Sequence, residues 1–339
     1  MGVKLTEILP SHELEFDDLK GKIIVIDGFL VLYQFLTSIR QQDGTPLLDS
    51  KGRVTSHLQG LFARTTNMMQ KGIKLAFVFD GQAPILKKKI QEARSKIKKE
   101  AMKNFEEAEQ EQNIELMKKY AGRTARLTPE MVEESKNLLA ALGIPWVQAP
   151  SEGEAQAAAI VSNGDAYAVG TQDADALLFG APCLIKNLTI SEKKKTPNKL
   201  SFISIKPTKI VLAEVLASLE VTQDQLIAMG MLVGTDYNPG GIKGIGAKKA
   251  LKLVKEHISL ANLFTSVSWE KHFDFSWKEV FDTIKNIPIT NEYSLKWKNH
   301  DQQEIIKILC VEHDFSQERI ITALQKINNG GQQGLERWA

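Results

Sequence analysis

Seven acidic residues lie where short apolar stretches of this chain end, and carboxylates in that position can bind divalent cations. They are Asp27, Asp80, Glu152, Glu154, Asp173, Asp175 and Asp236. Ligands of open α/β sheets bind outside the carboxyl ends of the strands, so acids delivered there from several segments would share one crevice. Such like charges repel each other unless cations neutralise them. Hard oxygen ligands suit Mg²⁺ or Mn²⁺.

Each acid alone is weak evidence, because an acid after a strand is often a helix cap or a turn residue. Ser151 to Glu154 matches the S-x-x-E capping box, which gives Glu154 a structural alternative; capping does not require Glu152. Asp173 and Asp175 alone would also match the D-x-D of a phosphatase with an aspartyl nucleophile. That alternative leaves the other acids without a role. Together the seven favour a two-metal phosphodiesterase, in which cations about 3.5–4 Å apart clamp the attacking and leaving oxygens.

The elements that would position these acids follow an α/β pattern. β-branched and aromatic runs at 22–26, 75–79 and 166–170 predict buried parallel strands. Pro129 at a first helical position predicts a helix that Gly143 ends. We therefore expect a mostly parallel central sheet flanked by helices.

A charged segment interrupts this pattern. From Leu86 to Phe105 apolar residues recur every three or four positions, which predicts a helix, and seven lysines and arginines lie between residues 87 and 99. A charge run usually marks a solvated helix face. Its position directly after a strand-terminal acid favours a phosphate-binding role instead.

A glycine-rich turn at residues 241–250 provides a second candidate for phosphate contact. Gly244 and Gly246 permit a tight turn with exposed N–H groups before a helix, and Lys243, Lys248 and Lys249 add positive charge. The turn lies between two predicted helices, so neither the P-loop nor the dinucleotide-binding fingerprint applies. A helix–hairpin–helix that grips a nucleic-acid backbone fits better than a plain helical turn.

Bulk composition is that of an ordinary globular protein. Of 339 residues, 43% are hydrophobic and 25% charged, with a net charge of +2, so nucleic acid would need local basic patches. Cys183 and Cys310 are far apart, which favours an intracellular protein without a disulfide framework. We expect neither a signal peptide nor a membrane-spanning segment.

The last residues, 331–339, are mostly polar, and Leu335 and Trp338 are their two large apolar side chains. Gln332, Leu335 and Trp338 are spaced by three, so Leu335 and Trp338 would share one face of a short helix. The alternative is a frayed tail with an incidental tryptophan. We favour docking into an apolar groove of a partner.

These motifs together resemble the flap endonucleases, of the archaeal type, in the XPG-like structure-specific 5′ nuclease family. The resemblance rests on residues 26–27, 33–36, 55–58, VFDG at 78–81, APSEGEA at 149–155, TQDAD at 171–175, GTDY at 234–237 and residues 244–246. They occur in family order over residues 1–255, and residues 256–330 match more weakly.

The resemblance implies a PIN-like fold and a two-Mg²⁺ site in the seven acids, with Mn²⁺ as a substitute. It implies that Lys87 and Arg94, at the base of a helical arch, contact the scissile phosphate, and that Tyr33 stacks on a base. It assigns handling of the downstream edge and 3′ flap to Arg40, Thr55 and Arg64. It also implies a K⁺ ion at the glycine-rich turn, and a free N-terminal Gly2 near the active site.

The implied organisation has six parts. They are an N-terminal nuclease part at 1–85, an arch insertion at 86–128, an internal nuclease part at 129–225, a helix–two-turn–helix at 226–258, a C-terminal helical region at 259–330 and a tail at 331–339 that binds a sliding clamp (PCNA). The tail ends in Trp338-Ala339 where the family has two aromatics, so we expect reduced clamp affinity.

The implied function is a monomeric, intracellular (cytoplasm or nucleoid) 5′ flap endonuclease with 5′–3′ exonuclease activity, acting in DNA replication (Okazaki fragment maturation) and repair. The nearest rivals are a 5′ exonuclease and an RNase H-like enzyme for RNA–DNA hybrids. A non-catalytic DNA-bending or clamp-adaptor protein would use the glycine-rich turn and the tail, but it has no need for seven clustered acids.

Overall fold

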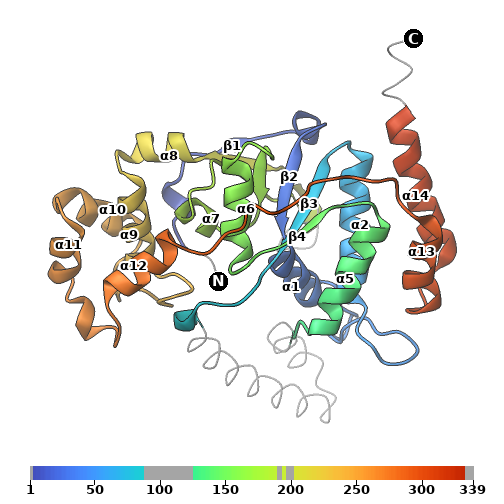
Figure 1. Cartoon of the computed structure of the whole chain (residues 1–339), viewed down its shortest axis with the longest axis horizontal. Helices are drawn as coiled ribbons and strands as arrows, with labels where there is room; N and C mark the ends of the chain where they lie inside the picture. Colours follow the sequence, from blue (N-terminus) through green and yellow to red (C-terminus); the bar gives the residue numbers. More distant parts are fainter. Residues whose placement is uncertain (1–2, 88–124, 189–192, 196–201, 333–339) are drawn as a thin grey trace.

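The computed structural model describes residues 3–87, 125–188, 193–195 and 202–332 (Figure 1). Most of the predicted arch, including Arg94, and the tail residues Leu335 and Trp338 lie outside these residues. No helix in the described ranges combines the length and the apolar character needed to cross a membrane.

A mixed, mostly parallel sheet forms the centre of the described chain and confirms the predicted fold class. Its strands run in the order β1-β9-β6-β5-β2-β3-β4, and β7 and β8 form a separate antiparallel pair. The bounds are β1 His12–Glu13, β2 Ile23–Asp27, β3 Lys74–Phe79, β4 Trp146–Gln148, β5 Ala168–Gly170, β6 Cys183–Lys186, β7 Lys193–Lys195, β8 Phe202–Ser204 and β9 Thr208–Val211. Strands β2 to β6 are parallel, whereas β9 is antiparallel to β6 and β1.

Helices cover both faces of this sheet, as its apolar runs require. The helices are α1 Gly28–Ser38, α2 Ser56–Gln70, α5 Pro129–Ala141, α6 Gly153–Ser162, α7 Asp175–Leu178, α8 Leu212–Leu219, α9 Gln223–Val233, α10 Ala247–Glu256, α11 Leu260–Ser266, α12 Trp277–Lys285, α13 Gln302–Ile306 and α14 Gln317–Gln332. The described ranges also contain 3₁₀ turns at Thr6–Ile8, Phe16–Leu19 and Trp269–Lys271, a π-helical turn at Lys307–Val311 and a short helical segment at residues 85–87.

The central strand β2 shows how the sheet divides the core. Ile24 and Ile26 point to the face covered by α1, α2 and α5, whereas Val25 points to the face covered by α6. All three side chains are fully buried. This alternation is the period-2 pattern of a strand, and burial on both faces fixes the register. The register in turn places Asp27, the last residue of β2, at the carboxyl edge of the sheet.

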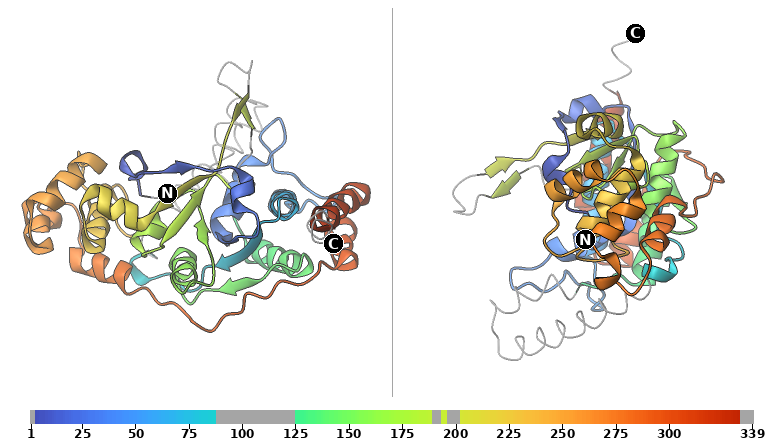
Figure 2. Two further views of the ribbon diagram at one scale, coloured as in Figure 1. Left: turned by 90° about the horizontal axis from the view of Figure 1, so that it is seen from above. Right: turned by 90° about the vertical axis from the view of Figure 1, so that its left-hand side faces the viewer.

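An extended strap, residues 287–301, joins α12 to α13 across the outside of the molecule (Figure 2). Gln156 of α6 exchanges hydrogen bonds with the backbone of Thr290, and the Trp297 indole donates to Leu75 O at 2.7 Å. Lys298 N donates to Gly143 O at 2.9 Å. The predicted C-terminal helical region therefore contains a long non-helical segment that is hydrogen-bonded to α6, to β3 and to the backbone of Gly143.

The strap approaches Gly143 too closely for a side chain. Gly143 has a φ of +72°, and a Cβ there would lie 2.0 Å from Lys298 O. We expect Gly143→Ala to lower the free energy of unfolding by the penalty of positive φ, about 1–2 kcal/mol, plus roughly 1–3 kcal/mol for the clash.

Gly164→Ala is the matched control, because Gly164 also has a positive φ (+82°) but a Cβ added there would meet nothing within 4 Å. Urea unfolding of both variants measures the difference. Equal losses in the two would show that the strap does not constrain Gly143.

Candidate active site

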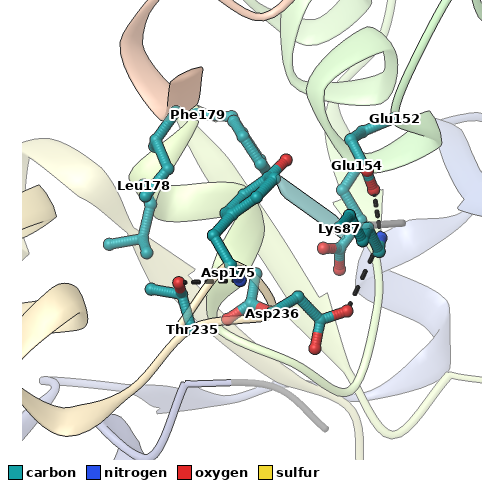
Figure 3. Close-up of a pocket in the computed structure, with 10 residues that line it drawn as sticks. Lys87, Glu152, Glu154, Asp175, Leu178, Phe179, Thr235 and Asp236 are labelled. Atoms are coloured by element: carbon teal, nitrogen blue, oxygen red, sulfur yellow. Dashed lines mark hydrogen bonds and ion pairs between the residues drawn. The ribbon is translucent and has the colours of Figure 1, made fainter. Parts of the chain in front are cut away.

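The structure brings the seven acids of the acidic cluster to the carboxyl edge of the sheet. Asp27 ends β2, Asp80 follows β3, Asp173 and Asp175 follow β5, and Glu152 and Glu154 lie at the start of α6, while Asp236 follows α9. Each is close enough to others of the cluster for direct charge–charge interaction. Figure 3 shows four of them around the side chain of Lys87.

Backbone N–H groups fix two of these carboxylates. Asp27 caps α1 by accepting a hydrogen bond from Leu30 N at 3.0 Å, and Asp80 accepts one from Gly153 N at 2.7 Å. A Cβ at Gly153 would lie 2.7 Å from the same Asp80 oxygen, so a side chain there would displace the Asp80 carboxylate. Gln148 of the edge strand β4 donates to the Asp80 carbonyl at 2.7 Å. The local fold therefore orients both acids before any ligand binds.

The predicted capping box at the start of α6 does not form. Ser151 Oγ donates to Gln82 O at 3.1 Å, and the helix begins later, with Glu152 at the N-cap making no side-chain cap bond. The Glu154 carboxylate instead accepts from Thr171 Oγ1 at 3.3 Å. Helix capping therefore does not explain Glu154, and both glutamates belong to the pocket.

The N-terminal segment reaches the same site. Val3 is buried, and its N–H donates to Asp175 Oδ1 at 2.6 Å. Asp173 is held through its backbone N–H, which donates to Thr171 Oγ1 at 3.2 Å. Gly2, expected near the site, lies outside the described residues, but its neighbour Val3 contacts the cluster directly.

A rigid turn positions Asp236. Thr235 Oγ1 donates to Asn238 Oδ1 at 2.6 Å and accepts from Tyr237 N at 3.1 Å, and Asn238 Nδ2 donates to Met231 O at 2.6 Å. The turn begins at Gly234, whose φ of +114° ends α9. Asp236 and Tyr237 are thereby presented to the pocket, which both of them line.

Lys87 lies at the centre of the acidic cluster. Its Nζ is 2.5 Å from Glu152 Oε2 and 3.5 Å from Asp236 Oδ2, and the side chain is 14% exposed (Figure 3). Burial opposes its charge, but Glu152, Asp236 and Asp80 outweigh burial and raise the pKa of Lys87. One ammonium group thus balances part of the negative charge.

Burial, and repulsion from the negative charge that Lys87 does not balance, raise the pKa values of the carboxyl groups. Burial first, and then the neighbouring acids, raise the pKa of Asp27 and of Asp175 to about 7. Burial likewise raises the pKa of Asp80, of Glu152 and, by a larger amount, of Glu154. The same surroundings raise the pKa of the Tyr237 hydroxyl. Added positive charge would relieve this repulsion.

The donor set suits a hard divalent cation, because it consists of carboxylate oxygens with a surplus of negative charge. Among the described residues, no three carboxylate, histidine or cysteine side chains already converge in a metal-holding arrangement. Lys87 lies between two of the acids, and raised pKa values favour protonation of others. Both effects stabilise the observed arrangement, in which the carboxylates are spread apart. Both oppose the closer grouping of carboxylates that a bound cation would favour.

The residues expected to handle DNA lie on neighbouring elements. Tyr33 is half-buried on α1 and Arg64 half-buried on α2, and these helices pack together. Arg40 lies in the loop that joins these helices and donates to the carbonyls of Leu36, on α1, and Gly44, in the loop. Thr55, just before α2, is buried.

A buried network holds that loop. Asp49 accepts from Arg53 Nε at 2.7 Å and lies 3.2 Å from His313 Nδ1. The carboxylate of Glu134, on α5, connects His313 to a second histidine, His57. Its Oε1 lies 3.5 Å from His313 Nε2, and its Oε2 lies 3.0 Å from His57 Nε2. The loop between α1 and α2 is therefore tied to the C-terminal part of the chain.

The glycine-rich turn connects α9 and α10, as predicted. Gly244 has a φ of +83°, and Gly246 is the N-cap of α10. Lys243, Lys248 and Lys249 are exposed, while Ala247, Ala250 and Val254 face the core. The basic face of α10 is thus presented to solvent. At the other end of the chain, Gln332 of the predicted clamp-binding tail is the last residue of α14.

Repulsion within the cluster leads to a stability prediction. The pKa of Asp27 is about 7 when folded against an ordinary 3.8, so the folded state binds its proton more tightly. The destabilisation by ionised Asp27 is therefore absent below about pH 4, grows as pH rises and is complete above about pH 7. Without metal at pH 8, Asp27→Asn should stabilise the fold by roughly 0.5–2 kcal/mol, because asparagine also caps helices.

Thermal unfolding in EDTA from pH 5 to 8 measures this difference, which should widen with pH. Asp274→Asn, at an exposed aspartate outside the cluster, is the control and should match the wild-type curve. A difference between Asp27→Asn and wild type that is independent of pH would contradict the buried, repelled state of Asp27.

Comparison with known proteins identifies the family. The model of the XPG N-terminal domain matches residues 1–101, and that of the XPG I-region matches residues 143–236. Flap endonuclease 1 of Staphylothermus marinus is 49% identical and that of Pyrococcus furiosus 48%; each alignment covers 100% of this chain and 99% of the relative.

Solved structures agree with this assignment. Flap endonuclease-1 from Methanococcus jannaschii has a TM-score of 0.76 at 41% identity, covering 97% of this chain and 98% of that one. The catalytic core of Rad2 in complex with DNA substrate has a TM-score of 0.71 at 20% identity, covering 96% and 100%, which shows the shared fold. The chain belongs to the flap endonuclease 1 family of XPG-type nucleases.

Proposed function

We propose that this chain is a structure-specific 5′ flap endonuclease, with 5′–3′ exonuclease activity, that hydrolyses DNA phosphodiesters near the junction between duplex and 5′ flap. The observation that carries the proposal is the acidic cluster at the sheet's carboxyl edge with Lys87 at its centre. The similarity to flap endonucleases over the whole chain supports the choice of substrate.

The acidic cluster would hold two Mg²⁺ ions, with Mn²⁺ as a substitute. When bound, such a pair lowers the pKa of a water molecule and stabilises the leaving oxygen. The chain's own contribution is to preorganise the ligands: backbone N–H groups from Leu30, Gly153 and Val3 each hold one carboxylate oxygen.

Lys87 and Arg94 would offset the charge that develops on the scissile phosphate. Lys87 is bound by Glu152 and Asp236 in the described structure, so its ammonium reaches a phosphate after those contacts break. The 5′ flap would pass under or through the arch, residues 86–128.

Duplex DNA would be held by shape and backbone rather than by base sequence. The exposed lysines Lys243, Lys248 and Lys249, with Gly244 and Gly246, would contact one strand, with K⁺ at the turn. Tyr33 would stack on a base beside the cut. Arg40, Thr55 and Arg64 would shape the surface for the downstream edge and 3′ flap.

Residues 332–339 would bind the sliding clamp (PCNA) through Gln332, Leu335 and Trp338. Ala339 removes half of the aromatic anchor, so we expect weaker binding than a tail with two aromatics gives. The enzyme would act as an intracellular monomer in DNA replication, including Okazaki fragment maturation, and in repair.

One double-flap substrate tests the activity. With Mg²⁺ the chain should cut within about a nucleotide of the junction, and EDTA should abolish cutting. Asp173→Ala should remove cleavage while the Kd for flap DNA, measured in Ca²⁺, stays near the wild-type value. Wild-type cleavage by Asp173→Ala would refute the site, and Mg²⁺-dependent binding without any cleavage would favour the adaptor alternative.

Lys87→Ala tests the role of the central lysine. Loss of one transition-state donor should slow single-turnover cleavage by roughly 10²–10³-fold. Lys285→Ala is the control, because Lys285 pairs with Asp224 at 2.8 Å outside the acidic cluster. A circular-dichroism melt checks that both variants are folded, and an unchanged rate in Lys87→Ala would remove Lys87 from catalysis.

A further inference from the structure

The hydroxyl of Tyr237 is buried without a hydrogen-bond partner. The side chain is 3% exposed and lines the same pocket as Lys87, Glu152 and Glu154. Within the described part of the chain, its oxygen is one of three buried side-chain polar atoms that make no hydrogen bond, with His57 Nδ1 and Gln223 Oε1. Leaving such a group unpaired costs free energy, so the fold retains it against a penalty.

Hydrogen bonds within the turn and packing in the core hold Tyr237 in place. Tyr237 N donates to Thr235 Oγ1, and Thr235 in turn donates to Asn238, which is fully buried. The ring itself belongs to the apolar core cluster on the α6 side of the sheet. Tyr237 is therefore held as a packed aromatic side chain in the lining of the pocket that also contains Glu152, Glu154 and Asp236.

The chemistry of the pocket limits what the hydroxyl can bind. Ionised carboxylates accept hydrogen bonds but cannot donate them. The single proton of the Thr235 hydroxyl is already donated to Asn238. A phenol is protonated at neutral pH and can donate. Its oxygen is fully buried, so a DNA phosphate flanked by two esters is too large a partner, whereas a single water molecule is small enough.

We propose that Tyr237 is a positioning residue whose hydroxyl donates a hydrogen bond to a water molecule held by the acidic cluster. The water bridges the phenol to the carboxylates, among which Glu152, Asp236 and Glu154 interact with the phenol most strongly. Tyr237 transfers no proton in this role and only orients the water. The inference rests on the proposed function, because an oriented water contributes to hydrolysis.

Tyr237→Phe removes the hydroxyl and keeps the ring. Loss of an outer-shell partner typically reduces activity roughly 10- to 100-fold, so single-turnover cleavage should fall by that factor while the Kd for flap DNA in Ca²⁺ stays within twofold. Stability should fall by no more than the net contribution of one hydrogen bond.

Tyr293→Phe is the matched control. Tyr293 lies on the strap, away from the acidic pocket, and its hydroxyl donates to Asp165 Oδ2 at 2.6 Å. This variant also removes a hydroxyl that makes a hydrogen bond, but it should leave cleavage unchanged, so only Tyr237→Phe should slow the reaction. If Tyr237→Phe cuts within twofold of the wild-type rate, or loses activity only through weaker DNA binding, the positioning role is overturned.

A crystal structure of the wild-type chain in Mg²⁺ decides the question without any cleavage. It should show a water molecule within hydrogen-bond distance of the Tyr237 hydroxyl and of a cluster carboxylate. A direct Tyr237–carboxylate hydrogen bond, or a dry hydroxyl, would overturn the proposal. Because this measurement needs no activity, it separates a failure of the water site from a failure of the proposed function.

Discussion

Mutual repulsion of carboxylates is the constraint on which the rest of this structure depends. Parallel strands bring their carboxyl ends to one edge, and the register of buried residues such as Val25 leaves no freedom to move Asp27 away. The acids stay together because the packed sheet holds them, because several bind protons tightly, and because Lys87 supplies a cation. A site that is unfavourable in isolation persists where the surrounding fold determines it.

The sequence could predict the elements that carry strong local patterns. The strands before Asp27 and Asp80 and the helix that begins at Pro129 are formed as expected, and so is the glycine-rich turn between two helices. Those patterns also predicted that the acids would lie at the carboxyl edge of the sheet, because the carboxyl ends of parallel strands share that edge.

Other features depend on contacts between distant residues, which local patterns do not contain. Strand Trp146–Gln148 is too short to show a period, and the strap, residues 287–301, is extended because it bonds to carbonyls such as that of Leu75. The capping box at Ser151–Glu154 does not form because the Ser151 hydroxyl donates its hydrogen bond to Gln82 O instead. Tyr237 stands next to an acid in the GTDY motif, but only the fold shows that its hydroxyl is buried without a partner.

The position of Lys87 links the charge of the site to the segment that follows it. Leu86 is buried in the core cluster, and Lys87 N donates to Pro84 O at 3.0 Å, so the start of that segment is anchored beside the acids. The ammonium can pair with Glu152 and Asp236 or with a phosphate, but the two sets of partners compete for the same three donors. Neutralising the acids weakens the first set and leaves the lysine available for the second. In the proposed mechanism, charge balance in the pocket would thus determine when Lys87, at the base of the inserted segment, can contact the scissile phosphate.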